Sequence, residues 1–323
     1  MERIVVTGAA GQIGSELVPE LRALYGAENV VAVGHKTPIP DDVREAGPYA
    51  YFEVSDYGQV EELLKRHEAD TLFHLSSILS ALAEENRESA FEVNVRGLHN
   101  VLEVAERTGT KRVIVPGSIA NYGPEAPKDN TPDDTAQRPN TLYGISKVFA
   151  ELMGDYYNGK LGMKCRGVRL PGIISWKTEP TAGTTDYAVA VFYGAIRRKH
   201  YTCYLEPDTR LPMMYMPDAI GSLMQIAEAD LSPNGRAQYN VNSMSFTPTE
   251  LFDAIRRRVP DLAIDYEIDP VRQAIAESWP DSLDDSAARA DWAWMPGYDI
   301  DSVVDDMLEN LGRKLASEDE RAG

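Results

Sequence analysis

Short apolar runs alternate along the chain with longer segments in which apolar residues recur at helical spacing. The runs typical of buried strands are Ile4–Val6, Val30–Val33, Thr71–His74, Val113–Val115 and Cys165–Leu170. Helical patterns lie between several of these runs, near residues 61–67, 89–107 and 142–158. This alternation predicts an α/β fold, because parallel strands are joined by crossover helices. We expect a doubly wound parallel sheet.

A glycine-rich turn follows the first predicted strand. Residues 7–14 read TGAAGQIG and precede a helical pattern. In that context Gly8 permits a tight turn, Gly11 lets the backbone approach a pyrophosphate, and Gly14 allows close packing of helix and strand. The amides at the start of the helix would hold the phosphates. The turn favours a dinucleotide-binding domain of the Rossmann type over a plain strand-to-helix turn, with the cofactor residues Gly8, Gly11, Gln12, Ile13 and Gly14.

The pattern becomes irregular after the fifth predicted strand. Residues 247–250 read TPTE and are typical of a helix start, and prolines recur at positions 260, 270, 280 and 296. We therefore predict a dinucleotide-binding domain over residues 1–170 and a smaller C-terminal substrate-capping region over residues 171–323. Residues 216–230 are expected to return to the sheet domain. No linker separates the two parts.

Tyr143 and Lys147 supply the candidate proton chemistry. They are four residues apart in a predicted helix, so their side chains share one face. The pKa of a free tyrosine is about 10, so a tyrosine that acts as a base near pH 7 needs a pKa lower by about 3 units, or about 4 kcal/mol. Lys147 and a positively charged nicotinamide ring are the candidate sources. Such a pair alone is usually part of a half-exposed helix, and the glycine turn upstream favours catalysis.

With these motifs the chain resembles the short-chain dehydrogenase/reductase superfamily, in its extended, epimerase/dehydratase-like branch. Further landmarks are FHLSS at residues 73–77, NVRG at 94–97 and VPGSIANYG at 115–123. The resemblance implies that Ser118 hydrogen-bonds the reacting oxygen, Tyr143 exchanges its proton, and Lys147 binds the ribose while lowering the pKa of the phenol. Without its neighbours Ser118 would be interpreted as a turn serine.

The same resemblance implies further cofactor contacts and an assembly. The cofactor residues implied are Leu75, Ser76, Ser77, Asn94, Tyr143, Lys147, Pro171 and Ile173. In the wider superfamily the helices that correspond to residues 89–107 and 142–158 form the dimer interface. We therefore expect a homodimer.

Three downstream segments carry a narrower resemblance, to the short-chain-type L-threonine 3-dehydrogenases. They are residues 169–180 (RLPGIISWKTEP), 183–188 (GTTDYA) and 212–220 (PMMYMPDAI). That family oxidises the Cβ alcohol of L-threonine with NAD, giving 2-amino-3-ketobutyrate. The implied substrate-binding residues are Ser80, Ser118, Tyr143, Thr184, Thr185 and Asp186.

The residue types suit a zwitterionic substrate. Asp186 can accept hydrogen bonds from the ammonium group, and the hydroxyls of Thr184 and Thr185 can donate to the carboxylate. A simpler interpretation is that these three residues cap the apolar helix predicted over 187–193. The two interpretations are compatible, because a helix N-terminus also favours a bound carboxylate.

The sequence departs from the usual NAD pattern after the second strand. An acidic residue is expected there to bind the ribose 2′-hydroxyl, but Gly34, His35 and Lys36 occupy the segment. His35 and Lys36 could tolerate a 2′-phosphate, which leaves NADP open. The dehydrogenase resemblance favours NAD, which we predict, with both side chains at the cofactor. Glu53 and Val54 occupy the region that flanks adenine in the superfamily.

Charge and cysteine content limit the partners. The chain of 323 residues has 51 acidic and 32 basic residues, a net charge of −19, which argues against nucleic acid or an anionic membrane as partner. No apolar run approaches the roughly 20 residues of a membrane span, and Met1 directly precedes a strand, so we expect a cytoplasmic protein. Cys165 and Cys203 lack metal-ligand spacing, and we predict no metal site. His74 is expected to end a buried strand.

Two other functions share parts of this pattern. A nucleotide-sugar 4-epimerase would have the same fold and the same Tyr/Lys pair. A dehydratase is disfavoured, because Ile119 and Ala120 stand where acidic residues are expected. A non-catalytic dinucleotide-sensing protein would have no need of Ser118, Tyr143 and Lys147 together.

Overall fold

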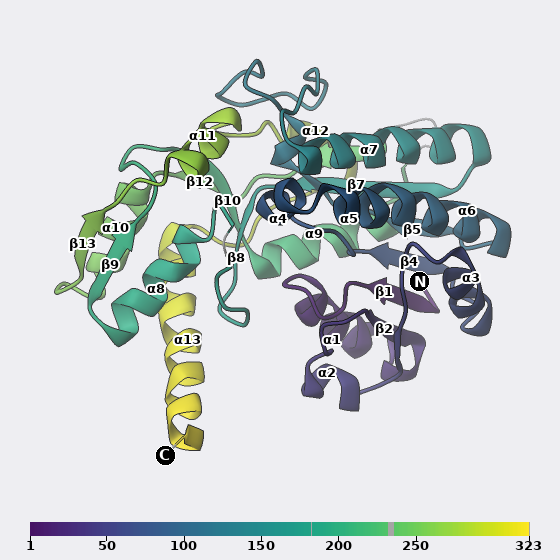
Figure 1. The fold of residues 1–323 in the computed structure, drawn as a ribbon, viewed down its shortest axis with the longest axis horizontal. Helices are drawn as coiled ribbons and strands as arrows, with labels where there is room; N and C mark the ends of the chain where they lie inside the picture. Colours follow the sequence, from purple (N-terminus) through teal and green to yellow (C-terminus); the bar gives the residue numbers. More distant parts are fainter. Residues whose placement is uncertain (182, 232–235, 323) are drawn as a thin grey trace.

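The computed structural model describes residues 1–181, 183–231 and 236–322, and its centre is a sheet of eight parallel strands (Figure 1). The strand order is β11-β7-β5-β4-β1-β2-β3, and β6 pairs with β7. The bounds are β1 Ile4–Thr7, β2 Val30–Gly34, β3 Tyr49–Tyr51, β4 Thr71–His74, β5 Arg112–Ile114, β6 Gly117–Ser118, β7 Lys164–Leu170 and β11 Gln238–Asn240. All five strands predicted from the sequence lie in this sheet.

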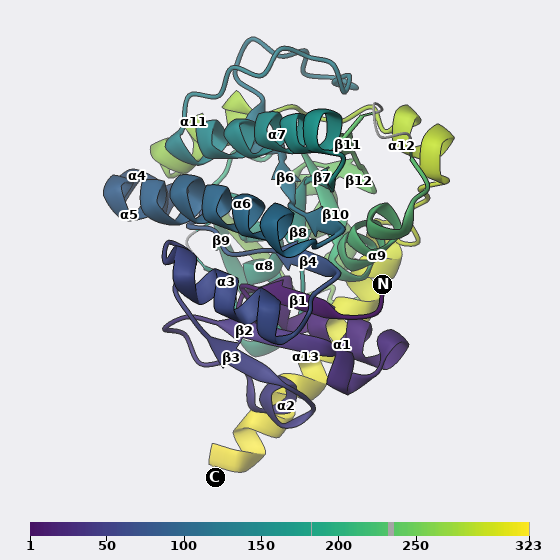
Figure 2. The ribbon, with the colours of Figure 1, turned by 90° about the vertical axis from the view of Figure 1, so that its right-hand side faces the viewer.

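Helices cover both faces of the sheet. Successive residues of β1 separate the two layers, because Val5 packs with one hydrophobic cluster and Val6 with the other. The helices of this domain are α1 Gly14–Tyr25, α2 Asp41–Glu45, α3 Tyr57–Arg66, α4 Ser80–Glu85, α5 Arg87–Phe91, α6 Leu98–Thr108, α7 Leu142–Leu161, α9 Met216–Glu228 and α12 Ser286–Trp292, with 3₁₀ turns η1 Ala27–Asn29 and η3 Ile119–Asn121. Figure 2 shows α6 and α7 on one side of the sheet and α1 and α9 on the other. The predicted doubly wound α/β fold is confirmed.

The helix predicted over residues 89–107 has an irregular middle. Between α5 and α6 lies a six-residue π-helix, η2 Glu92–Gly97. Gly97 fits closely there, since an added Cβ would lie 2.7 Å from Cγ2 of Val54. A π-helical turn is a local departure from the 3.6-residue period and is frequent at functional sites. The apolar periodicity of the sequence did not predict it.

The remaining elements form a smaller region beside the sheet (Figure 1). A three-stranded sheet has the order β12-β10-β8, and β9 pairs with β13. The elements are β8 Gly172–Ile174, α8 Tyr187–Arg197, β9 His200–Cys203, β10 Leu211–Tyr215, β12 Met244–Phe246, α10 Pro248–Arg256, β13 Ala263–Tyr266, α11 Pro270–Ser278 and α13 Ile300–Ala322. The TPTE motif starts α10 as predicted, because the Thr247 hydroxyl accepts from the Glu250 amide at 3.2 Å while the Glu250 carboxylate accepts from the Thr247 amide at 2.9 Å.

The chain returns to the main sheet after β10. Helix α9 packs against β7 and β5, and β11 adds a parallel strand beside β7. The sequence analysis did not predict β11, which has only three residues. Over the described ranges of the chain, no helix is both long and apolar enough to cross a bilayer.

Candidate active site

The glycine turn lies between β1 and α1, at the carboxyl end of the sheet. Gly8 has a φ of +70°, and an added Cβ would lie 2.8 Å from the carbonyl carbon of Leu75. A Cβ on Gly14 would lie 2.2 Å from the carbonyl oxygen of Gly8. At Gly11 the nearest atom would be that same oxygen, at 3.2 Å. Backbone packing therefore requires Gly8 and Gly14 most strictly, and a Cβ on Gly11 would also be tighter than an ordinary contact.

A cavity of about 770 Å³ opens beside this turn. Its volume is in the range of cofactor and small-molecule sites. The predicted cofactor residues that line it are Gly8, Gly11, His35, Lys36, Glu53, Val54, Leu75, Ser76 and Ser77. The predicted residues outside this lining are Gln12, Ile13, Gly14, Asn94, Tyr143, Lys147, Pro171 and Ile173. The cavity, the helix N-terminus at Gly14 and the place of Gly11 in the lining fit the adenosine and phosphate end of a dinucleotide.

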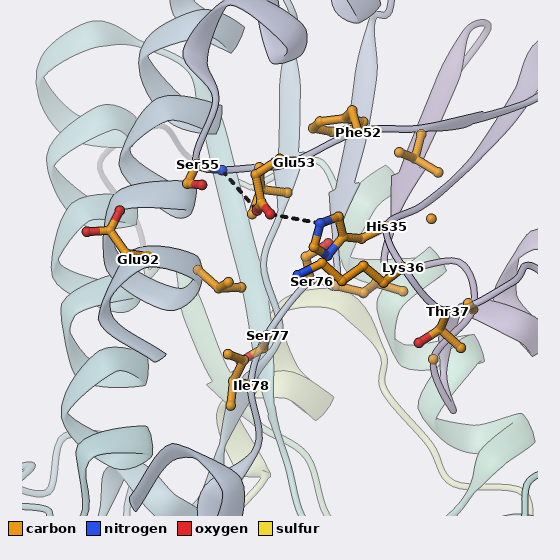
Figure 3. A pocket seen from close by; sticks show the side chains of 18 of the residues that line it. His35, Lys36, Thr37, Phe52, Glu53, Ser55, Ser76, Ser77, Ile78 and Glu92 are labelled. Atoms are coloured by element: carbon orange, nitrogen blue, oxygen red, sulfur yellow. Dashed lines mark hydrogen bonds and ion pairs between the residues drawn. The ribbon is translucent and has the colours of Figure 1, made fainter. Parts of the chain in front are cut away.

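A contact between a carboxylate and an imidazole lies in the lining of this cavity. Oε2 of Glu53 is 2.8 Å from Nε2 of His35 (Figure 3). Glu53 follows β3 and His35 follows β2, so two adjacent strand ends supply the pair. Lys36 lies beside His35 in the same view.

Asn94 holds the loop after β4 against α7. Its side-chain oxygen accepts from the Ile78 amide at 2.7 Å, and its side-chain nitrogen donates to the Ile78 carbonyl at 2.9 Å and to the Ser146 hydroxyl at 3.3 Å. The amide of Asn94 is thus engaged with protein groups. Its position favours an indirect role, in which it shapes the loop that carries Ser76 and Ser77.

The first turn of α7 packs against the turn that carries Ser118. A Cβ on Gly144 would lie 2.2 Å from the carbonyl oxygen of Ala120, so these backbones are in direct contact. The Ser118 hydroxyl accepts from the Ala120 amide at 3.1 Å, which caps η3, and it lies close enough to the Tyr143 hydroxyl to affect the pKa of that phenol. The turn-serine interpretation and the catalytic one are therefore compatible. Nζ of Lys147 lies 5.5 Å from the centre of the Tyr143 ring and donates to the Pro116 carbonyl at 2.9 Å.

Burial has the largest effect on the pKa of Tyr143. Burial raises the pKa of Tyr143 to about 12, and the hydrogen bond with Ser118 offsets part of that rise. Burial also lowers the pKa of Lys147 to about 8, against the opposing effect of Glu151. The expected depression of the phenol pKa is thus not produced by the protein side chains alone, because desolvation outweighs them. Further positive charge beside the hydroxyl is needed for Tyr143 to act as a base.

A buried charge network behind the catalytic residues was missed by the sequence analysis. Arg169 on β7 donates to both carboxylate oxygens of Glu151 at 2.8 Å, and to Oδ1 of Asp133 at 3.1 Å. A Cβ on Gly117, the residue before Ser118, would lie 3.0 Å from Oε1 of Glu151. Glu151 follows Lys147 by four residues, as Lys147 follows Tyr143. That repeat on one helix face was the signal available in the sequence.

The predicted substrate residues come from two segments. Thr184 is buried, and Cγ2 of Thr185 lies 2.7 Å from the position of a Cβ on Gly172, the residue after Pro171. Ser80 begins α4, which packs against α7. The segment of Ser80 therefore approaches the helix that carries Tyr143 and Lys147, whereas Thr185 lies against β8, which carries the predicted cofactor residue Ile173.

The hydrogen bonds of Asp186 do not match the capping interpretation. It occupies the N-cap position of α8, but its side chain makes no capping hydrogen bond. The carboxylate instead accepts from the Thr181 hydroxyl at 2.7 Å. The local loop satisfies Asp186, so its side chain stabilises the loop conformation rather than the helix end.

His74 is buried at the end of β4. Burial lowers the pKa of His74 to about 3, with a smaller effect of Lys147, and the ring lies 2.9 Å from the Thr7 hydroxyl. This matches the expected buried strand end. In the described part of the chain, no group of three or more His, Cys, Asp or Glu residues is arranged to hold a metal ion.

Comparisons with known proteins agree with this arrangement. Residues 4–241 match the model of the NAD dependent epimerase/dehydratase family. The chain is 44% identical over 311 residues to mitochondrial L-threonine 3-dehydrogenase of Bos taurus. The matched region covers 96% of this chain and 83% of the bovine protein. It is 43% identical over 315 residues to an uncharacterized epimerase/dehydratase of Staphylococcus aureus, covering 97% and 98%. The structure of L-threonine dehydrogenase from Clostridium difficile matches with a TM-score of 0.94 at 45% identity, covering 97% and 98%.

Proposed function

This chain belongs to the NAD dependent epimerase/dehydratase family, and we propose that it is an oxidoreductase that transfers hydride from the Cβ alcohol of L-threonine to NAD, giving 2-amino-3-ketobutyrate. The observation that carries the proposal is the contact between the first turn of α7 and the Ser118 turn, which brings Ser118 near enough to Tyr143 to affect the pKa of its phenol. The relatives named L-threonine 3-dehydrogenase support the choice of substrate.

In this proposal Tyr143 accepts the proton of the Cβ hydroxyl. Ser118 donates a hydrogen bond to the same oxygen and steadies its developing negative charge. Lys147 contributes positive charge behind the phenol and binds the ribose. NAD supplies the hydride acceptor and a positive charge beside the hydroxyl. Proton and hydride transfer are efficient only if the reacting atoms are held in line, which the packed turns provide.

The dinucleotide would be held along the carboxyl edge of the sheet. Gly11, Gln12 and Ile13 face its phosphates, and the cavity that His35 and Glu53 line receives its adenosine. Pro171 and Ile173 would lie at the nicotinamide end. Within this division, residues 1–170 bind the coenzyme and residues 171–323 mainly bind the substrate, with 216–230 belonging to the sheet domain.

The amino acid would lie between the segment of Thr184 to Asp186 and the helix that begins at Ser80. The threonine hydroxyls suit the substrate carboxylate, and the Asp186 carboxylate suits the ammonium group. Asp186 can serve both the ammonium and Thr181, because a carboxylate has about four acceptor positions.

A homodimer is part of the proposal. Four large apolar side chains on α4, α5 and α7 are at least half exposed, namely Leu82 (57%), Phe91 (50%), Leu152 (63%) and Tyr156 (53%). Burial of such side chains between two copies would be favourable. Light scattering on the purified chain is expected to give twice the chain mass. A cytoplasmic location stays a prediction.

The first test is an assay of reduced-coenzyme absorbance with L-threonine and either NAD or NADP. We expect NADH to form, and Tyr143→Phe to lower turnover by at least about 100-fold while coenzyme binding is largely retained. Retention of most activity by Tyr143→Phe would exclude the proposed proton path.

The second candidate function is a nucleotide-sugar 4-epimerase, which the matched family model also covers. Epimerisation of a UDP-sugar without turnover of L-threonine would favour it. Saturable coenzyme binding without turnover of any alcohol would favour a non-catalytic dinucleotide-sensing protein. The relatives named dehydrogenase make both alternatives weaker than the proposed reaction.

A further inference from the structure

The usual position for an acid that binds the adenosine ribose is closed in this chain. A Cβ on Gly34 would lie 2.8 Å from Cε1 of Tyr51 and 3.0 Å from Cγ1 of Ile39. The Tyr51 hydroxyl accepts from the Ile39 amide at 3.0 Å, which fixes the ring over Gly34. Any side chain at position 34 would require the Tyr51 ring to move.

A carboxylate reaches the same cavity from the neighbouring strand. Gly34 and Tyr51 are partners in the β2–β3 register, and Glu53 follows Tyr51 by two residues. The Glu53 side chain lies in the cavity lining, and its carboxylate contacts a ring nitrogen of His35 (Figure 3). Glu53 therefore stands one strand away from the usual acid, at the same edge of the sheet.

The charges around the cavity disfavour a second anionic group. Among the described lining residues, Glu53, Glu88 and Glu92 carry carboxylates, and Lys36 carries an ammonium group. His35, the other basic lining residue, has one ring nitrogen engaged with Glu53. A phosphate monoester adds a charge of about −1.5 to −2, whereas a ribose hydroxyl adds none and can donate a hydrogen bond to a carboxylate.

We propose that Glu53 is the residue by which this chain selects NAD over NADP. Its carboxylate accepts from the adenosine ribose in place of the missing acid, repels a 2′-phosphate, and keeps His35 from binding that phosphate. The inference rests on the proposed function for the class of coenzyme, and it is independent of L-threonine as the substrate.

The test compares coenzyme binding without substrate. Dissociation constants for NADH and NADPH would be measured from coenzyme fluorescence for the wild-type chain, Glu53→Gln and Glu61→Gln. The last variant is a matched control, because the Glu61 side chain is 28% exposed, pairs with a basic side chain, Lys65, at 2.9 Å, and lies on α3 outside the cavity lining. Thermal unfolding of each variant would verify that the fold is retained.

We expect the wild-type chain to bind NADH at least about tenfold more tightly than NADPH, which corresponds to about 1.4 kcal/mol. Glu53→Gln should tighten NADPH binding about tenfold and weaken NADH binding severalfold. Glu61→Gln should leave the ratio of the two constants within about twofold of the wild-type value, because Glu61 pairs with Lys65 outside the cavity lining.

Two results would overturn the inference: wild-type binding of NADPH as tight as that of NADH, or a ratio that Glu53→Gln changes no more than Glu61→Gln does. Selective NADH binding that depends on Glu53, without turnover of L-threonine, would support the inference and contradict the proposed reaction. Failure to bind either dinucleotide would contradict both.

Discussion

The two ends of the proposed coenzyme site, along the carboxyl edge of the main sheet, are built differently. At the catalytic end, the side chains that support Ser118 and Lys147 are almost completely buried, with Glu151 4% and Arg169 5% exposed. At the adenosine end, His35 and Glu53 have side chains that are 47% and 33% exposed, and a contact of 2.8 Å joins them. Proton transfer needs fixed distances, which buried contacts provide. Discrimination between coenzymes needs charge, which a partly exposed pair provides without a rigid framework.

The largest expected effect is the loss of stability when the buried charge network at the catalytic end is disrupted. Glu151→Gln should lower the free energy of unfolding by about 3–5 kcal/mol, because it leaves the buried Arg169 guanidinium without its main counter-charge. Glu53→Gln at the adenosine end should cost less than about 1 kcal/mol, since surface ion pairs contribute little. Urea unfolding of both variants measures the difference. Equal losses would contradict the contrast between the two ends.

The glycine turn lies between the two ends. Substitution of one of its glycines should mainly affect stability, and substitution of another should mainly affect coenzyme binding. Gly14→Ala should destabilise the fold by about 1–3 kcal/mol, because its Cβ would meet the Gly8 carbonyl oxygen. Gly11→Ala should change the free energy of unfolding by less than about 1 kcal/mol and weaken coenzyme binding at least about tenfold. Thermal unfolding and coenzyme titration of both variants check this. Normal coenzyme binding by Gly11→Ala would show that the phosphates lie elsewhere.

His74, on the central strand β4, should make stability depend on pH. Its pKa is about 3 in the folded chain, below the usual 6.5, so the unfolded chain binds the extra proton. Its contribution is complete above pH 6.5 and is lost as the pH falls toward 3. Between pH 7 and pH 5 it should cost about 2 kcal/mol. His74→Gln should remove that part of the pH dependence of the free energy of unfolding, measured with urea. An unchanged pH dependence would show that His74 binds its proton equally well in the folded and the unfolded chain.

Local sequence patterns predicted the framework at both ends. The glycine turn, the five strands and the Tyr143/Lys147 pair depend on residues close in sequence, so their spacing was sufficient. The network of Arg169 and Glu151 could not be found in this way, because β7 and α7 meet only in the folded chain. The effect of burial on the pKa of Tyr143 was not predicted for the same reason, since burial depends on packing from distant segments.

The adenosine end shows a second limit. The sequence placed His35 and Glu53 at the coenzyme separately, but the contact between them depends on the pairing of β2 with β3. Likewise, the sequence predicted Asp186 near the start of α8 but not its hydrogen bond with Thr181 across a short loop. Pair contacts of this kind depend on register and loop conformation, which periodicity does not determine.

Transfer of hydride from the Cβ of L-threonine is the central claim, and isotope tracing tests it most directly. L-Threonine with deuterium at Cβ would be incubated with the chain and NAD, and the reduced coenzyme analysed by mass spectrometry. The account predicts NADH that is heavier by one mass unit, and its absence with Tyr143→Phe. Unlabelled NADH would show that hydride comes from another carbon, and absence of NADH with the wild-type chain would contradict the proposed reaction.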